Sequence, residues 1–182
     1  MRSFLSLDLT PDLRSTLVTL QKRLLPFDVK LVEPENLHFT IKFLGDIDET
    51  TARDVSNQLT ILLERYPSFD TDIRGVGVFP HLSAPRVVWV GSPGLCYLYA
   101  AVETAVSDHF SPNLAVIPHV TLARARSSRD HAALREFIET HRESVFGSMT
   151  VREVKLMKSI ITPQGPVYED ISVFPLMLSH GH

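Results

Sequence analysis

Cysteine is almost absent from this sequence, since Cys96 is the only thiol among 182 residues. One thiol cannot form an internal disulfide, so disulfide-stapled secreted folds are excluded and a reducing compartment is expected. Cys96 lies in the apolar run GLCYLYAAV, where a free cysteine usually behaves as a small buried hydrophobe. We therefore expect Cys96 to be buried and to take no part in chemistry.

An excess of positive charge is also missing. The formal net charge is −3 at pH 7, whereas proteins that grip many nucleic-acid phosphates are usually basic. An extended electrostatic clamp on nucleic acid is therefore not expected. An RNA partner would be contacted over a short, local stretch such as one end.

Long apolar runs and metal-binding patterns are missing as well. No run approaches the roughly 18 apolar residues of a membrane span, and Ser3, Ser6 and Asp8 interrupt the segment that a signal peptide would need. The sequence contains neither HExxH nor CxxC, the spacings typical of zinc sites. We expect a cytoplasmic, monomeric protein that uses no metal and no other cofactor.

Two similar series of strands and helices follow one another along the chain. Alternating apolar residues indicate strands and apolar residues three or four apart indicate helices, while Thr10 with Pro11, and Asp48, are typical of helix starts. In the last helix Ala133, Phe137 and Ile138 are expected to face inward. The predicted strands are 3–9, 38–44, 69–79, 86–91, 117–123, 150–161 and 167–177, and the predicted helices follow Thr10 and Asp48 and cover 94–110 and 129–143.

The first notable motif is an HxT tripeptide in ENLHFTIKFLG, residues 35–45. Side chains two residues apart share a face of a strand, so His38 and Thr40 point together, with Lys42 next in the row. The apolar side chains between them are expected to face the core on the other side; they are Phe39, Ile41 and Phe43.

The second half repeats this tripeptide in PHVTLAR, residues 118–124. His119 and Thr121 share a face, opposite Val120 and Leu122. Each HxT strand lies between two predicted helices, which indicates a pseudo-twofold α+β protein of two lobes. Such symmetry would line one cleft with two imidazoles and two hydroxyls.

Two imidazoles and two hydroxyls suit attack on a phosphodiester without a metal. A neutral imidazole can take a proton from the nucleophile while a protonated one gives a proton to the leaving oxygen. The threonine hydroxyls can donate to the non-bridging oxygens, where charge accumulates. Arg124, five residues after His119, can add a forked contact to phosphate. The two motifs are too alike for the sequence alone to tell the acid from the base.

Each motif also has an ordinary structural interpretation. A lone strand histidine is more often structural, threonine is a common strand former, and Arg124 can be a solvated charge at a strand end. Two copies at corresponding places are harder to explain in this way. The remaining histidines lie in predicted loops, helices or the tail and are expected at the surface; they are His81, His109, His131, His141, His180 and His182.

The paired motifs His38-Phe39-Thr40-Ile41 and His119-Val120-Thr121-Leu122 resemble those of the two-histidine phosphoesterase superfamily. Within it the chain is most similar to the RNA 2′,3′-cyclic phosphodiesterases, formerly called 2′-5′ RNA ligases. The resemblance runs nearly end to end, through FLSLDL, PENLHFTIKFLG, GVGVFP, PRVVWVG, PHVTLAR and GPVYEDISVFPL.

The resemblance implies one two-lobed catalytic domain over residues 1–182, with two antiparallel sheets lining a central cleft and helices outside. It implies metal-independent hydrolysis of RNA 2′,3′-cyclic phosphate ends, for example on tRNA fragments, to 2′-phosphomonoesters. His38 would be the acid and His119 the base. The phosphate would be held by Thr40, Thr121 and Arg124, and the terminal base would stack on Phe43. Phe43 lies on the wrong side of a regular strand for this role, so a bend near Gly45 is needed.

Two alternatives remain open at this point. An RNA 5′-hydroxyl in place of water would give a 2′-5′ RNA ligase, although water outcompetes an RNA end that no basic groove holds. A protein that binds RNA ends without catalysis could also keep this fold. The presence of both histidines and both threonines argues against the second alternative.

Overall fold

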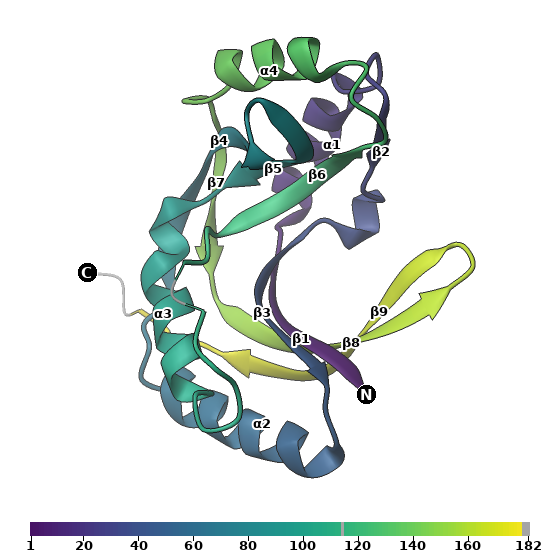
Figure 1. The fold of residues 1–182 in the computed structure, drawn as a ribbon. Helices are drawn as coiled ribbons and strands as arrows, with labels where there is room; N and C mark the ends of the chain where they lie inside the picture. Colours follow the sequence, from purple (N-terminus) through teal and green to yellow (C-terminus); the bar gives the residue numbers. More distant parts are fainter. Residues whose placement is uncertain (114, 180–182) are drawn as a thin grey trace.

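The computed structural model describes residues 1–113 and 115–179. Its strands form one antiparallel nine-stranded sheet in the spatial order β7-β4-β5-β6-β3-β1-β8-β9, with β2 paired to β6 outside this path (Figure 1). The strands are β1 (Arg2–Asp8), β2 (Val29–Leu31), β3 (His38–Asp46), β4 (Phe69–His81), β5 (Ala84–Gly91), β6 (His119–Ala125), β7 (Val145–Val151), β8 (Glu153–Thr162) and β9 (Gly165–Pro175). The α-helices are α1 (Pro11–Lys22), α2 (Glu49–Leu63), α3 (Cys96–Ala105) and α4 (His131–Thr140), and two short 3-10 turns are η1 (Pro34–Asn36) and η2 (Pro93–Leu95).

The sheet has two halves that meet at a single residue pair. β3 pairs with β6 only through Phe39 and Val120, with β1, β8 and β9 beyond β3 and with β5, β4 and β7 beyond β6. The predicted α+β class is therefore confirmed. The two predicted sheets are continuous with each other through this one pair.

The first two helices begin where their capping residues predict. The Thr10 side chain accepts a hydrogen bond from the backbone N–H of Leu13 with Pro11 in the first turn, and Asp48 Oδ1 accepts one from Thr51 N at 2.8 Å. Leucines at helical spacing give α1 a stripe that is buried in the core; they are Leu13, Leu17 and Leu20, and Leu24 just beyond the helix is buried as well. No helix among the described residues is long and apolar enough to span a membrane.

Two of the helices cross between the halves. α1 follows β1 in sequence but packs against β6 and β7, while α3 follows β5 but packs against β3. Each HxT strand is therefore backed by a helix from the other half of the chain. The helices and the apolar core share one face of the sheet, and the HxT side chains lie on the other.

The C-terminal half differs from the prediction in its strands and in one helix face. Residues 145–151 form a separate edge strand, β7, next to β4, whereas the prediction began a strand at 150. Gly147 and Ser148 interrupt the apolar alternation there, so the pattern is weak. In α4 the buried side chains are Leu134, Phe137 and Ile138, and the predicted inward Ala133 is exposed.

The predictions for Cys96 and His141 are also wrong. Cys96 is exposed, because it begins α3 on the side away from the buried Leu98 and Tyr99. His141 is buried instead of lying at the surface: its Nδ1 bonds to the Phe137 carbonyl at 2.8 Å and its Nε2 lies 2.8 Å from Arg23 Nη1. A histidine that ends a helix can turn back over the last turn, which the apolar pattern does not reveal. His180 and His182 lie outside the described residues.

Candidate active site

The four motif side chains flank the pair that joins the halves. Phe39 and Val120 are fully buried, so the residues on either side of them point to the opposite face. The antiparallel pairing of Phe39 with Val120 places one histidine and one threonine on each side of the junction. We call this side of the sheet the histidine face.

His38 is held by its backbone neighbours and by two aromatic rings. Its Nδ1 donates to the carbonyl of Asn36 at 2.7 Å, and its Nε2 lies 2.9 Å from the hydroxyl of Thr40. Because a carbonyl can only accept, the proton of the neutral ring is on Nδ1 and Nε2 is the basic nitrogen. The rings of Phe4 and Tyr168 pack against the imidazole, with centroids at 5.2 and 5.3 Å.

His119 has an equivalent arrangement. Its Nδ1 donates to the carbonyl of Ile117 at 2.6 Å, which again leaves Nε2 as the basic nitrogen of the neutral ring. The rings of Phe79 and Trp89 pack against it, with centroids at 4.9 and 5.9 Å. Each imidazole is thus oriented by the carbonyl two residues before it and packs against two aromatic side chains that also contact each other.

Burial lowers the pKa of both imidazoles, since it disfavours the charged ring. For His38 the bond to the Asn36 carbonyl and the Asp8 carboxylate oppose this lowering of the pKa, while Arg14 and His119 add to it. Because His38 and His119 are direct neighbours of the paired residues Phe39 and Val120, the structure brings the two predicted catalytic histidines to the same junction.

The charge next to each histidine differs in sign. Asp8 pairs with His38 across β1 and β3, and its carboxylate raises the pKa of His38. Gly91 pairs with His119 across β5 and β6 and has no side chain. The charged neighbour of His119 is Arg124, which lowers the pKa of that imidazole. The Asp8 carboxylate therefore offsets part of the lowering of the pKa of His38 that burial and Arg14 cause, whereas at His119 the guanidinium of Arg124 adds to the lowering by burial.

Asp8 is itself held by a cation. Lys155 Nζ on β8 donates to Asp8 Oδ2 at 2.7 Å and to Asp170 Oδ2 at 2.8 Å. The ion pair with Lys155 holds the Asp8 carboxylate in place beside His38. Asp8 and Lys155 were not predicted as site residues from the sequence, and neither were the four aromatic neighbours of the histidines. The only sequence signal for Asp8 is that it shares a face with Phe4 and Ser6 in an alternating strand.

Phe43 reaches the histidine face through an irregularity in β3. Ser6 pairs with Thr40 but the next residue back, Leu5, pairs with Lys42, so Ile41 has no partner in β1. This β-bulge reverses the alternation of the side chains beyond it. Phe43 is 76% exposed and lies 6.3 Å from the ring of Phe4 on the histidine face. β3 is irregular at two places, at Ile41 and at Leu44 next to the predicted Gly45, and the irregularity at Ile41 is the one that precedes Phe43 and sets its face.

The same bulge reverses the predicted position of Lys42. It was expected beside His38 and Thr40, yet it is buried on the opposite face of the sheet, which the helices cover and which we call the helix face. There Nζ lies 2.5 Å from Glu103 Oε2. A regular strand was assumed in that prediction, and one extra residue changes the face of every side chain that follows.

β6 contains a bulge at the equivalent place. Trp89 pairs with Thr121 and the preceding Val88 pairs with Ala123, so Leu122 has no partner in β5. Ala123 is buried and Arg124 is exposed, on the same face as His119 and Thr121. Phe43 and Arg124 therefore occupy corresponding positions, each five residues after its histidine.

No metal site accompanies these residues in the part of the chain that is described. Among residues 1–113 and 115–179 no group of three or more His, Cys, Asp or Glu side chains is arranged to hold an ion. The histidine face presents the two imidazoles, the two threonine hydroxyls, the Asp8 carboxylate and the Arg124 guanidinium. They can move protons and bind a phosphate.

Comparison with known proteins points in one direction. Residues 7–89 match the model of a family described as LigT-like phosphoesterases. The RNA 2′,3′-cyclic phosphodiesterase of Methanothermobacter thermautotrophicus is 40% identical, over 97% of this chain and 99% of the relative. That of Methanocaldococcus jannaschii is 30% identical, over 94% of this chain and 98% of the relative.

Solved structures agree with these relatives. The crystal structure of a Thermus thermophilus protein superposes with a TM-score of 0.82 at 28% identity, over 99% of this chain and 100% of that protein. Apo LigT from E. coli shares the fold, with a TM-score of 0.77 at 23% identity and 97% of both chains covered. Since relatives of 30–40% identity match almost end to end, this chain belongs to the LigT-like phosphoesterases, the family of the RNA 2′,3′-cyclic phosphodiesterases.

Proposed function

We propose that this chain hydrolyses RNA 2′,3′-cyclic phosphate ends to 2′-phosphomonoesters, with His38 as the acid and His119 as the base. One observation carries the proposal: two oriented imidazoles flank the junction of the halves, one beside a carboxylate and the other beside a guanidinium. That difference in charge suits a pair in which one ring is protonated and the other is neutral.

In the proposed reaction the Nε2 atom of His119 takes a proton from a water molecule as its oxygen attacks phosphorus. The bond between phosphorus and the 3′ oxygen breaks, and the Nε2 proton of His38 goes to that oxygen. The products are a 2′-phosphomonoester and a 3′-hydroxyl. Each positioned proton transfer contributes roughly 10²–10⁴-fold to the rate.

The remaining groups on the histidine face fit the substrate. Thr40 and Thr121 would donate to the non-bridging oxygens, and Arg124 would neutralise their charge. The exposed ring of Phe43 offers a stacking surface for the terminal base. With a net charge of −3, we propose contact with the RNA end alone, for example on tRNA fragments.

Ligation is not favoured as the activity. The relatives are named for phosphodiester hydrolysis, and the net charge of −3 disfavours an extended groove that would hold a second RNA. We propose further that residues 1–182 act as one two-lobed catalytic domain and as a monomer, because both histidines come from the same chain.

The proposal is tested with an oligonucleotide that carries a 2′,3′-cyclic phosphate, with and without a 5′-hydroxyl RNA. Purified protein should release the 2′-phosphomonoester in both mixtures, and excess chelator should leave the rate unchanged. A joined 2′-5′ product would support the ligase, and binding without turnover would support the non-catalytic alternative. Loss of activity on chelation that added divalent metal restores would reject the two-imidazole mechanism.

A further inference from the structure

Phe43 and Arg124 reach the histidine face only because β3 and β6 are bulged. In a regular strand a residue five positions after a histidine points to the opposite face. Phe43 would then enter the core and Arg124 would place a guanidinium among apolar side chains. The bulges at Ile41 and Leu122 prevent this, so whatever stabilises the bulges also places these two side chains.

The bulge of β6 is supported by a buried amide from α1. Gln21 is 2% exposed, and its Nε2 donates to the carbonyl of Leu122 at 2.8 Å and to that of Val32 at 2.8 Å. Leu122 is the residue without a partner in β5. Its carbonyl also accepts from Val32 N at 2.9 Å, so two donors meet at the irregular point of the strand.

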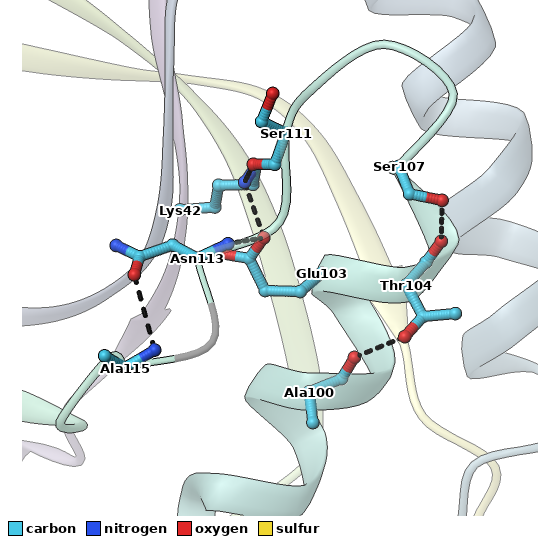
Figure 2. Close-up of polar contacts among 8 residues, drawn as sticks. All are labelled: Lys42, Ala100, Glu103, Thr104, Ser107, Ser111, Asn113 and Ala115. Atoms are coloured by element: carbon cyan, nitrogen blue, oxygen red, sulfur yellow. Dashed lines mark hydrogen bonds and ion pairs between the residues drawn. The ribbon is translucent and has the colours of Figure 1, made fainter.

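The bulge of β3 is supported by a buried carboxylate from α3. Glu103 is 3% exposed, and its Oε2 lies 2.5 Å from Lys42 Nζ, directly after the bulge. Figure 2 shows Lys42 and the backbone N–H of Asn113 converging on Glu103. Lys42 Nζ also donates to the carbonyl of Ser111 at 3.1 Å. Lys42 can stay on the helix face because its charge is paired there.

The pairing of Lys42 with Glu103 bears on two possible arrangements of β3, one regular and one bulged. In a regular strand Lys42 would extend into solvent on the histidine face and Phe43 would be buried, which hydrophobicity alone favours. Pairing with Glu103 makes the reverse arrangement stable. Buried polar pairs are best documented in this role, selecting one register where packing would allow another.

The two supports are related by the pseudo-symmetry of the fold. Gln21 and Glu103 lie at nearly the same distance along the chain before His38 and His119. Because α1 packs on β6 and α3 packs on β3, each residue reaches the bulged strand of the opposite half. The side chains at these equivalent places differ in chemistry. Gln21 places an amide beside β6, where Ala123 follows the bulge. Glu103 places a carboxylate beside β3, where Lys42 follows the bulge.

We propose that Gln21 and Glu103 are positioning residues that hold the two bulges and so place Arg124 and Phe43 toward the bound RNA end. The inference rests on the proposed function for its catalytic consequence. Its structural part, that Glu103 keeps residue 43 exposed, does not depend on any activity. Activity measurements test the catalytic consequence and labelling of residue 43 tests the structural part, so each can fail without the other.

The amide is tested by a double-mutant cycle with Arg124. Gln21→Leu keeps the size of the side chain and should lower kcat/KM about tenfold or more, as expected for a displaced charge-assisted contact. In an Arg124→Ala background the same change should cost almost nothing, because its target is gone. Gln58→Leu makes the same change on α2, which packs against α3 and β9; it is the matched control and should be silent.

The carboxylate is tested by thiol labelling. In a Cys96→Ser background, Phe43→Cys should react rapidly, and adding Glu103→Leu should slow it about tenfold or more as residue 43 turns inward. Leu25→Cys, also exposed, should label at the same rate with or without Glu103→Leu. If Glu103→Leu does not fold, Glu103→Gln removes the charge more gently and should slow labelling in the same direction.

A rescue separates positioning from general damage. Adding Lys42→Met to Glu103→Leu leaves no buried charge and keeps an apolar side chain on the helix face, so both labelling and kcat/KM should recover to within about threefold of wild type. Unchanged labelling in Glu103→Leu, no rescue by Lys42→Met, or equal losses from Gln21→Leu with and without Arg124 would each overturn the inference. A wild-type protein without hydrolytic activity would instead overturn the proposed function and leave the labelling test valid.

Discussion

The two halves of the sheet present the same backbone frame with different side chains. Both begin with a histidine whose Nδ1 donates to the carbonyl two residues before it, continue through a threonine, and bulge at the next apolar residue. They differ at the position paired with the histidine, where β1 offers Asp8 and β5 offers Gly91. They differ again after the bulge, where one half presents Phe43 and the other Arg124.

This comparison separates what orients the histidines from what distinguishes them. The shared carbonyl bonds and aromatic neighbours hold both rings with Nε2 as the basic nitrogen when neutral. The neighbouring charges act in opposite directions, since Asp8 raises the pKa of His38 and Arg124 lowers the pKa of His119, while burial lowers both. In the proposed mechanism the different roles of the two histidines are therefore assigned to the influence of Asp8 and Arg124, because the HxT motifs themselves are equivalent.

The largest expected effect comes from removing one of the two histidines. Replacing either His38 or His119 by alanine should lower kcat by roughly 10²–10⁴-fold, because each removes one positioned proton transfer. Steady-state rates on a cyclic-phosphate dinucleotide measure this loss. His81→Ala, an exposed histidine of β4, is the control and should keep full activity.

A smaller loss should follow from removing either hydroxyl. Thr40→Val and Thr121→Val keep the strand shape and remove one donor, so each should raise the barrier by roughly 2–4 kcal/mol, as for a lost oxyanion-hole donor. The loss should appear in kcat more than in KM. A valine variant within about twofold of wild type would show that the hydroxyls only support the strand.

The pH profile should shift between the free and the bound enzyme. Burial lowers the pKa of both imidazoles in the free protein, so the limbs of kcat/KM should lie below the ordinary histidine value of about 6.5. The bound phosphodiester is an anion that favours the charged ring, which moves the limbs of kcat to higher pH. Coincident limbs for kcat and kcat/KM would contradict this account of the site.

The smallest effect should come from the charge beside His38. The Asp8 carboxylate raises the pKa of His38, so Asp8→Asn should lower it. As the acid, His38 is active only below its pKa, and the basic limb of kcat/KM should therefore move to lower pH while the acidic limb stays in place. Asp12→Asn, an exposed residue of α1, is the control and should leave both limbs unchanged.

Local patterns in the sequence predict most of the fold. Thr10 and Asp48 begin helices as their residue types indicate, and the leucine spacing of α1 correctly predicts its buried stripe. β7 was missed because an edge strand interrupted by Gly147 has little apolar alternation. The junction through Phe39 and Val120 could not be predicted, since pairing between distant strands leaves no local mark.

The site was only partly predictable for a physical reason. Residues two apart in a strand share a face, so each histidine is correctly grouped with its threonine. A bulge defeats the same rule one residue later, which is why Lys42 was placed on the wrong face and Phe43 needed a bend. The bulges depend on Gln21 and Glu103, which lie far from the motifs in sequence and give no periodic signal.

The central claim is that His38 acts as the acid and His119 as the base, and a substrate with a better leaving group tests it most directly. A cyclic substrate with sulfur in place of the 3′ oxygen expels a thiolate, which needs little help from an acid. It should restore much of the rate of His38→Ala and leave His119→Ala as slow as with the oxygen substrate. Rescue of His119→Ala alone, or equal rescue of both variants, would contradict the assignment.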